Sequence, residues 1–380
     1  LQNRETDAFS EKNADLTHMQ RFVGRISALL NPLTLIIINA AVIILLQSGA
    51  IRVNSGSLTQ GQVVALYNLM AQILVELIKM ANLFITITKS LACADRVAAV
   101  MQLDSGANGG NKLPANGSPC GSVEFKNVSF EYKNAGAEAL FDISFFAKPG
   151  QTVGIIGGTG SGKSTLVNLV PNFYSATKGQ VLIDGVNADE YDRAALLSAV
   201  SVVPQKAVLF EGTIRSNLLM GNPNASEAEL FSALETAQAA EIVRTKPNGI
   251  DEPVLRGGSN FSGGQKQRLS IARALVHGGR ILILDDSASA LDFATDAKLR
   301  AAIRKLSPAP TTFIVSQRAA SVMFADFIIV LDEGRAVGQG THEELLRNCA
   351  VYREIYASQF PDEAAKLSIP NNTPEGDAAK

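Results

Sequence analysis

The sequence is poor in the residues that build metal centres and disulfide frameworks. It has three cysteines, Cys93, Cys120 and Cys349, whose spacing matches neither a metal motif nor a redox motif, and three scattered histidines. We therefore interpret the cysteines as free thiols in a reducing compartment. An excess of positive charge is also missing, because 34 basic residues stand against 36 acidic ones. A nucleic-acid-binding surface needs a basic stripe, so the composition argues against a nucleic-acid partner.

The chain also lacks a starting methionine and a signal-like segment. It begins Leu-Gln-Asn-Arg-Glu, without a basic region followed by a cleavable apolar stretch. We expect the chain to begin partway through a longer protein. Its 380 residues are enough for two or three domains.

Charged residues are absent from two long stretches near the N-terminus, residues 26–51 and 53–75. Roughly 20 apolar residues span a bilayer, so the sequence predicts transmembrane helices at about 26–48 and 60–89. A buried core helix is the alternative for the first stretch. Residues 1–25 are polar and indicate a cytoplasmic helix, and the basic residues outside the two stretches predict that both ends are cytoplasmic.

Two ionisable residues, Glu76 and Lys79, lie within the second predicted span. A charged group inside a membrane span is a functional-site hypothesis by default, which predicts a polar cavity at this level. The two residues are also three apart on a helix, so mutual pairing is an equally open interpretation.

Composition divides the remainder of the chain. Residues 1–103 form the expected membrane part, and residues 104–120 are rich in Gly, Asn and Pro and predict a linker. Residues 121–360 alternate strand patterns with helical segments, and residues 361–380 are polar and predict a disordered tail. Within 121–360 we expect strands at 123–132, 140–156 (two strands), 180–183, 200–203 and 280–284, with the pair 311–315 and 327–331 closing the sheet. Helices are expected at 164–169, throughout 213–245 and at 264–276.

The strongest chemical signal lies in residues 151–165. An apolar strand, residues 153–156, is followed by the pattern G-x-x-x-x-G-K-S and then by a helix. This arrangement is typical of a phosphate-binding loop, whose glycines let successive backbone N–H groups face phosphate oxygens. Lys163 is expected to reach the β- and γ-phosphates, and the Ser164 hydroxyl to bind Mg²⁺. The predicted nucleotide-binding residues are Gly157, Gly158, Thr159, Gly160, Ser161, Gly162, Lys163, Ser164 and Thr165.

Two later motifs identify a family. Phe261 is followed by Ser262, Gly263, Gly264 and Gln265, and a hydrophobic run from Ile281 ends in Asp285 and Asp286. With the phosphate-binding loop, in this order, they resemble the ATP-binding cassette (ABC) ATPases over residues 121–360. The resemblance implies an α/β P-loop NTPase fold, an ABC nucleotide-binding domain with an antiparallel β subdomain and a helical subdomain, preceded by all-α transmembrane helices.

The resemblance also implies roles for single residues. Tyr132 matches the aromatic residue that stacks on adenine, and Asp285 matches a ligand of Mg²⁺. Gln205 matches the glutamine that contacts Mg²⁺ and the attacking water, and Asp292 matches the family's D-loop. ATP and Mg²⁺ are the implied cofactors. Ser262, Gly263, Gly264 and Gln265 match the signature that completes the ATP site of a partner cassette.

The sequence departs from the family at two positions. Asp286 stands where hydrolytically competent cassettes have glutamate, so its carboxylate is shorter by about 1.5 Å, one C–C bond. Gln317 stands where the family has a histidine, and an amide can neither carry charge nor relay a proton. Both changes weaken chemistry at the γ-phosphate. We therefore expect this site to bind ATP and to hydrolyse it slowly.

Membrane helices before the cassette resemble those of ABC exporters in the cell membrane, where multi-pass chains move drugs or lipids. We expect this chain to be the C-terminal part of a half-transporter, paired with a second half-transporter that carries the competent residues, and to contact membrane lipid and a small amphipathic substrate. Three alternatives stay open: a homodimeric exporter with Asp286 as the base, a soluble ABC ATPase without transport function, and a regulatory nucleotide-binding element.

Overall fold

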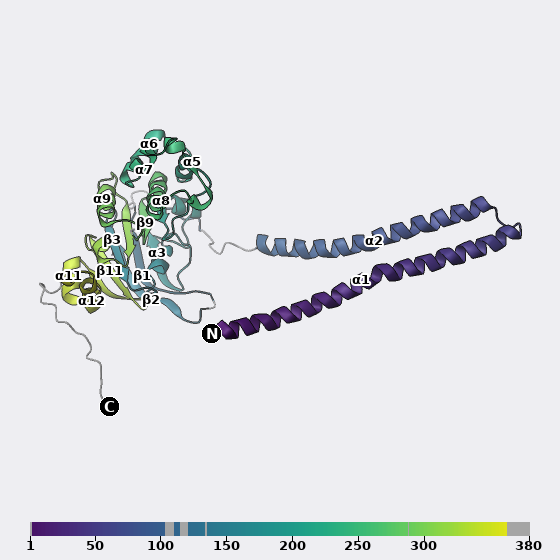
Figure 1. Ribbon diagram of the computed structural model, residues 1–380. Helices are drawn as coiled ribbons and strands as arrows, with labels where there is room; N and C mark the ends of the chain where they lie inside the picture. The colour runs from purple at the N-terminus through teal and green to yellow at the C-terminus, as the bar shows by residue number, and fades with distance from the viewer. Residues whose placement is uncertain (1, 103–109, 115–120, 134, 288, 363–380) are drawn as a thin grey trace, which may run out of the picture. The chain divides into compact units, whose positions relative to one another are not determined.

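The computed structural model describes residues 2–102, 110–114, 121–133, 135–287 and 289–362 (Figure 1). It divides the chain into a first unit, Leu1–Leu103, and a second unit, Asp104–Lys380. Most of the expected linker, and the expected disordered tail from residue 363 onward, lie outside the described residues. Within the expected linker, Gly110 and Lys112 form β-bridges with Asp192 and Tyr191 of the second unit.

The first unit consists of two long helices, α1 (Gln2–Asn54) and α2 (Gln60–Met101). Helix α1 runs through Pro32, so the expected cytoplasmic helix and the first expected span form one continuous element. A capping box at Thr59 begins α2, which extends past the expected end of the second span. A Cβ atom on Gly49 would lie 2.7 Å from Val63, so glycine allows the helices to approach closely beside the turn that joins them.

Apolar side chains cover the outside of both helices. Ile36, Ile43, Phe84 and Leu91 are each more than half exposed. The segment Pro32–Asn54 and helix α2 are long and apolar enough to cross a membrane. A helix that is apolar on all sides is stable only when lipid or protein surrounds it.

The two ionisable residues in α2 pair with each other. Lys79 Nζ lies 2.7 Å from a carboxylate oxygen of Glu76, which confirms the pairing interpretation. A role in lining a polar cavity stays a prediction.

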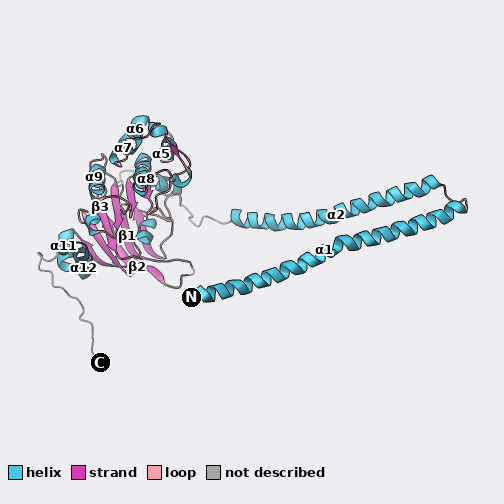
Figure 2. Ribbon diagram, in the orientation of Figure 1, coloured by secondary structure: helices cyan, strands magenta, loops and turns pink. Residues whose placement is uncertain are grey.

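The second unit contains two principal sheets (Figure 2). The antiparallel sheet has the order β2-β1-β4-β5, with β1 (Val123–Glu131), β2 (Glu138–Ala147), β4 (Lys178–Ile183) and β5 (Val186–Asn187). The larger sheet has the order β12-β11-β3-β10-β9-β6, with β3 (Thr152–Gly157), β6 (Val200–Val203), β9 (Ile281–Asp285), β10 (Thr311–Ser316), β11 (Phe327–Asp332) and β12 (Arg335–Gly340). Its strands are parallel except β12.

Helices connect the strands and cover the larger sheet. They are α3 (Lys163–Asn168), α4 (Arg193–Ala199), α8 (Gly263–His277), α9 (Phe293–Arg304), α10 (Ala319–Val322), α11 (His342–Asn348) and α12 (Ala350–Gln359). A helical region gathers at one end of the unit (Figure 2) and contains α5 (Ile214–Leu219), α6 (Glu227–Thr236), α7 (Ala240–Arg244), the 3₁₀ turns η1 (Gly249–Asp251) and η2 (Arg256–Gly258), and the small pair β7 (Gly212–Thr213) and β8 (Pro253–Val254).

The larger sheet is buried on both faces, because successive apolar side chains along its strands point to opposite faces and each face packs into a core. Along β9, Ile281 and Ile283 pack into a core shared with the antiparallel sheet. Leu282 and Leu284 pack into a second core shared with the helices. This two-sided burial explains why β9 reads as a continuous apolar run, as central parallel strands do. It also holds the ends of the parallel strands rigidly in place.

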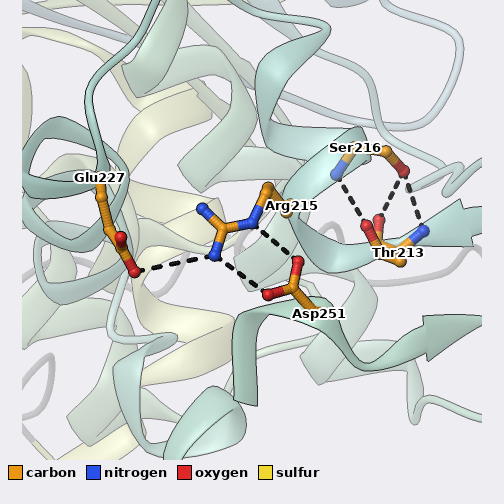
Figure 3. Close-up of polar contacts among 5 residues, drawn as sticks. All are labelled: Thr213, Arg215, Ser216, Glu227 and Asp251. Atoms are coloured by element: carbon orange, nitrogen blue, oxygen red, sulfur yellow. Dashed lines mark hydrogen bonds and ion pairs between the residues drawn. The ribbon is translucent and has the colours of Figure 1, made fainter. Parts of the chain in front are cut away.

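One arginine joins three elements of the helical region (Figure 3). Arg215, in α5, donates to both carboxylate oxygens of Asp251 in η1, over 2.7 and 3.0 Å. The same guanidinium group lies 3.7 Å from Glu227 in α6. Thr213 and Ser216 form a capping box that fixes the start of α5 directly beside this arginine.

The expectation that residues 327–331 close the sheet was wrong. Strand β12 pairs antiparallel with β11 and forms the edge. Its sequence, Arg-Ala-Val-Gly-Gln-Gly, carries two glycines and a weak apolar pattern, so strand propensity did not indicate it. Pairing with the buried strand β11 overrides that low propensity.

Candidate functional site

The phosphate-binding pattern lies in the loop between β3 and α3. Strand β3 is buried along its whole length, so the loop starts from a fixed point. A Cβ atom on Gly157 would lie 2.0 Å from the Leu331 carbonyl oxygen, which leaves room only for glycine. Gly160 and Gly162 have φ values of +82° and +93°, in the left-handed region that favours glycine. These constraints give the loop its tight curl.

Lys163 folds back over this loop. Its Nζ donates to the carbonyl oxygens of Gly157 and Gly158 and lies 3.0 Å from the first of them. Burial lowers the pKa of Lys163, while the nearby carboxylates of Asp286 and Asp285 act in the opposite direction. The ammonium group is thus held at the loop, where a polyphosphate would meet it.

Ser164 and Asp285 come together from different elements. The Ser164 hydroxyl, at the start of α3, donates over 3.0 Å to Oδ1 of Asp285, the last residue of β9. Burial raises the pKa of Asp285; the Ser164 hydrogen bond and the Lys163 charge oppose that shift, and the Asp286 charge adds to it. A divalent cation at this position would favour the ionised carboxylate.

The pair fits a magnesium ion. Ligand oxygens on adjacent corners of a Mg²⁺ octahedron are about 2.9 Å apart, since each lies about 2.0–2.1 Å from the metal. The 3.0 Å between the Ser164 hydroxyl oxygen and Oδ1 of Asp285 is close to this value. No cluster of three or more His, Cys, Asp or Glu side chains occurs among the residues described. Mg²⁺ held with a nucleotide needs none, because water and phosphate supply its other ligands.

Asp286 follows Asp285 in a strained conformation. Its φ is +44°, and its backbone N–H donates to the Val315 carbonyl over 3.0 Å. Its carboxylate accepts a 3.3 Å hydrogen bond from the amide of Gln205. Left-handed backbone at a non-glycine residue is uncommon and gathers at functional sites, where surrounding contacts hold it.

Gln317 lies just after β10 and lines the same cavity as these carboxylates. Its Oε1 is 3.5 Å from the Thr159 hydroxyl, at the limit of a hydrogen bond. The side chain is exposed, so it is available to a ligand bound in front of the loop.

These residues line one cavity of about 390 Å³. Tyr132 also lines it, and its hydroxyl lies 2.9 Å from the Thr165 hydroxyl. The Tyr132 ring contacts Phe130 and Tyr174 edge-on, which holds it upright at the cavity wall. The predicted residues that line the cavity are Tyr132, Thr159, Gly160, Gly162, Lys163, Ser164, Thr165, Gln205, Asp285, Asp286 and Gln317.

The predicted signature residues lie elsewhere. Ser262 caps α8 and forms a capping box with Gln265, and Gly263 and Gly264 begin the helix. Asp292 caps α9 by accepting from the Thr295 N–H. Among the described residues, neither group lines the 390 Å³ cavity. A larger apolar cavity of about 430 Å³, beside α9 and Phe324, contains none of the predicted residues.

Sequence reasoning missed part of the cavity wall. Glu138 and Ala139 of β2, and Glu333 and Gly334 of the turn after β11, also line it. The Gly334 carbonyl accepts a 2.8 Å hydrogen bond from Phe141, which ties this turn to the antiparallel sheet. An Asp-Glu-Gly turn between two strands was the available signal, and it was lost because β12 was not expected.

Comparison with known proteins agrees with this geometry. Residues 140–289 match the sequence profile of the family described as ABC transporter. An uncharacterized ABC transporter ATP-binding protein of Mycobacterium tuberculosis is 40% identical over 360 residues, covering 93% of this chain and 61% of the relative. An ATP-dependent lipid A-core flippase of Bordetella avium is 35% identical, over 94% of this chain and 61% of its own length. The chain thus spans about three fifths of these relatives.

A solved structure is similar as well. The structure of a bacterial Atm1-family ABC exporter with ATP bound superposes with a TM-score of 0.74 at 32% identity. The match covers 85% of this chain and 56% of that one. It supports the expected fold class, an α/β nucleotide-binding domain preceded by helices.

Proposed function

We propose, from the match of residues 140–289 to the ABC transporter family, that this chain is the ATP-binding part of an exporter whose own site binds MgATP and hydrolyses it slowly. The observation that carries this proposal is the contrast between neighbouring carboxylates. Asp285 pairs with Ser164 at 3.0 Å in metal-ligand geometry. Asp286 pairs with the amide of Gln205 at 3.3 Å.

Binding of the nucleotide rests on groups that match the family's pattern. Lys163 is held at the loop by backbone carbonyls, from which it can turn to phosphate oxygens. Ser164 and Asp285 would hold Mg²⁺, which supplies charge neutralisation at the phosphates when bound. Tyr132 lines the cavity and contacts two aromatic neighbours, and its ring would stack on the adenine base.

Hydrolysis needs a base or an orienting group at the attacking water. Both residues that would act on the γ-phosphate differ in this chain from those of hydrolytically competent cassettes. The Asp286 carboxylate is one methylene shorter than the family's glutamate, and misplacement on the order of 1 Å can cost about a hundredfold in rate. Gln317 can donate a hydrogen bond to a γ-phosphate oxygen, but it cannot add positive charge. ATP is therefore hydrolysed more slowly at this site than at a site with glutamate and histidine, and it stays bound for longer.

The membrane part of the proposal rests on the first unit. Apolar side chains project outward around α1 and α2, and lipid is the simplest surface that covers them. We place the chain in the cell membrane as part of a multi-pass exporter of lipids or small amphipathic drugs. The flippase of Bordetella avium supports the lipid class.

A second half-transporter is the proposed partner. Ser262, Gly263, Gly264 and Gln265 lie outside the chain's own cavity, as expected of residues that complete a partner's site. A partner with glutamate and histidine at the two substituted positions would form one competent site with this signature. The second candidate is a homodimeric exporter in which Asp286 is the base, since Asp286 lines the cavity and contacts Gln205.

The test is phosphate release by the full chain in lipid nanodiscs. The wild-type chain is expected to bind MgATP and release phosphate slowly, and the combined Asp286→Glu and Gln317→His variant to release it on the order of a hundredfold faster. Lys126→Ala, an exposed substitution on β1 away from the cavity, serves as the control. Brisk phosphate release by the wild-type chain would refute the slow-site proposal.

A further inference from the structure

The last residue of α12 contacts the segment that carries Gln317. Gln359 Nε2 donates to the Gln317 carbonyl oxygen over 2.8 Å, and Gln359 Oε1 accepts from the Ala319 N–H over 2.8 Å. One side-chain amide thus bonds the backbone on both sides of Arg318. The partners lie 42 and 40 residues away in sequence, so only the fold brings them together.

The contact satisfies backbone polar groups at the start of α10. Helix α10 begins after Arg318, which provides no side-chain cap. The first N–H groups of a helix have no partner inside it, and Ala319 is fully buried away from water. Gln359 supplies the missing acceptor from another helix, and its donor group holds the carbonyl of the preceding loop residue.

Gln359 is exposed, but the helix that it ends is anchored in the core. Tyr356 and Tyr352, one and two turns earlier on α12, are buried in the same core as Ala319 and Val322 of α10. Phe360, the next residue, packs its ring 4.9 Å from that of Tyr356. The Gln359 amide therefore reaches the loop from a helix whose tyrosines are anchored in the core.

Residues 317–319, which Gln359 contacts, also form hydrogen bonds to the residues that follow Asp286. Arg318 donates to the carbonyl oxygens of Ser289 and Leu291, over 3.2 and 3.4 Å. Ser289 in turn donates from its N–H and its hydroxyl to the Asp286 carbonyl. Displacement of the segment would disturb both side chains that distinguish this site.

We propose that Gln359 is a positioning residue for Gln317: its amide clamps the backbone at residues 317 and 319 and sets how closely the Gln317 side chain approaches the γ-phosphate. The inference rests on the proposed function in taking the γ-phosphate as the group in front of Gln317. Gln359 touches no nucleotide and acts only through the loop.

The readout is the preference of the full chain, in lipid nanodiscs, for MgATP over MgADP, because the two ligands differ by the γ-phosphate that Gln317 faces. Gln359→Leu removes both bonds and should lower the ATP-to-ADP affinity ratio roughly threefold to tenfold, the size of about one net hydrogen bond. MgADP affinity should be unchanged. Gln359→Glu keeps the acceptor for Ala319 but directs a carboxylate at the Gln317 carbonyl, so it should behave like the leucine variant.

Two comparisons separate positioning from general damage. Glu354→Leu, at an exposed position on the same helix, should leave the ratio unchanged. In a Gln317→Ala background, Gln359→Leu should add no further loss, because coupled residues are not additive. An equal loss for MgATP and MgADP, or a full additional loss in the Gln317→Ala background, would overturn the clamp.

The outcomes also distinguish this inference from the proposed function. If Gln317→Ala lowers the ratio and Gln359→Leu does not, the clamp alone is refuted. If the wild-type chain does not prefer MgATP, the assigned role of Gln317 fails and the clamp fails with it.

Discussion

The hydroxyl of Ser164 donates a 3.0 Å hydrogen bond to Oδ1 of Asp285, joining the start of α3 to the end of β9. The two residues are 121 positions apart in the chain. Their separation is close to that of adjacent ligands on Mg²⁺, and the proposed binding of MgATP rests on this pair.

Ser164→Ala should weaken MgATP binding on the order of tenfold to a hundredfold, because a contact to a charged group is lost. Chelation of Mg²⁺ should bring the wild-type chain close to the variant's affinity, and the variant should respond little to chelation. Isothermal titration with and without a chelator measures both. Ser198→Ala, at an exposed position on α4, is the control. Full sensitivity of Ser164→Ala to chelation would contradict the assigned ligand.

Single substitutions at Asp286 separate the two candidate functions. Asp286→Glu extends the carboxylate by one methylene and should raise phosphate release on the order of tenfold. Asp286→Asn should change the already slow rate little, since the shorter carboxylate is a poor base. The homodimer with Asp286 as the base predicts instead that Asp286→Asn loses nearly all activity. Single-turnover phosphate release distinguishes these results.

Glycine at 162 is required by the backbone, and glycine at 158 is not. Gly162 has a φ of +93°, and a Cβ there would lie 2.7 Å from Leu140 Cδ2. Gly162→Ala should destabilise the second unit by about 1–3 kcal/mol. A Cβ on Gly158 meets nothing within 4 Å, so Gly158→Ala should stay within about 0.5 kcal/mol of wild type. Denaturant unfolding measures both, and equal effects would refute this interpretation of the loop.

The Arg215–Asp251 contact predicts a pH dependence (Figure 3). The hydrogen bond from Arg215 lowers the pKa of Asp251. A carboxyl group whose folded pKa is lowered contributes stability above its unfolded pKa of about 3.9, and loses that contribution as pH falls through the folded value. Asp251→Asn should therefore lower the unfolding temperature at neutral pH, and the difference from wild type should begin to shrink as pH falls below about 4 and vanish below the lowered, folded pKa of Asp251. A difference that persists undiminished in strong acid would argue against the ion pair.

Sequence patterns identified the phosphate-binding loop because all its parts lie within 15 residues and each glycine has a local reason. The same holds for β3, β6 and β9, which are short apolar runs buried on both faces. Edge strand β12 was not predictable from its own residues, because its stability comes from pairing with β11. The cavity wall at Glu333, in the turn before β12, escaped prediction for the same reason.

The amino-acid sequence alone predicted the nucleotide-binding chemistry and determined the two substitutions, Asp286 and Gln317, because residue type decides the reach and charge of a side chain. Only the tertiary structure decided which distant side chains form hydrogen bonds to Asp286 and to the backbone of Gln317. The bonds from Gln205 to Asp286, and from Gln359 to the backbone of Gln317, link positions 81 and 42 residues apart. No local pattern encodes such contacts, since they arise when the packing of separate strands and helices brings distant side chains within hydrogen-bonding distance.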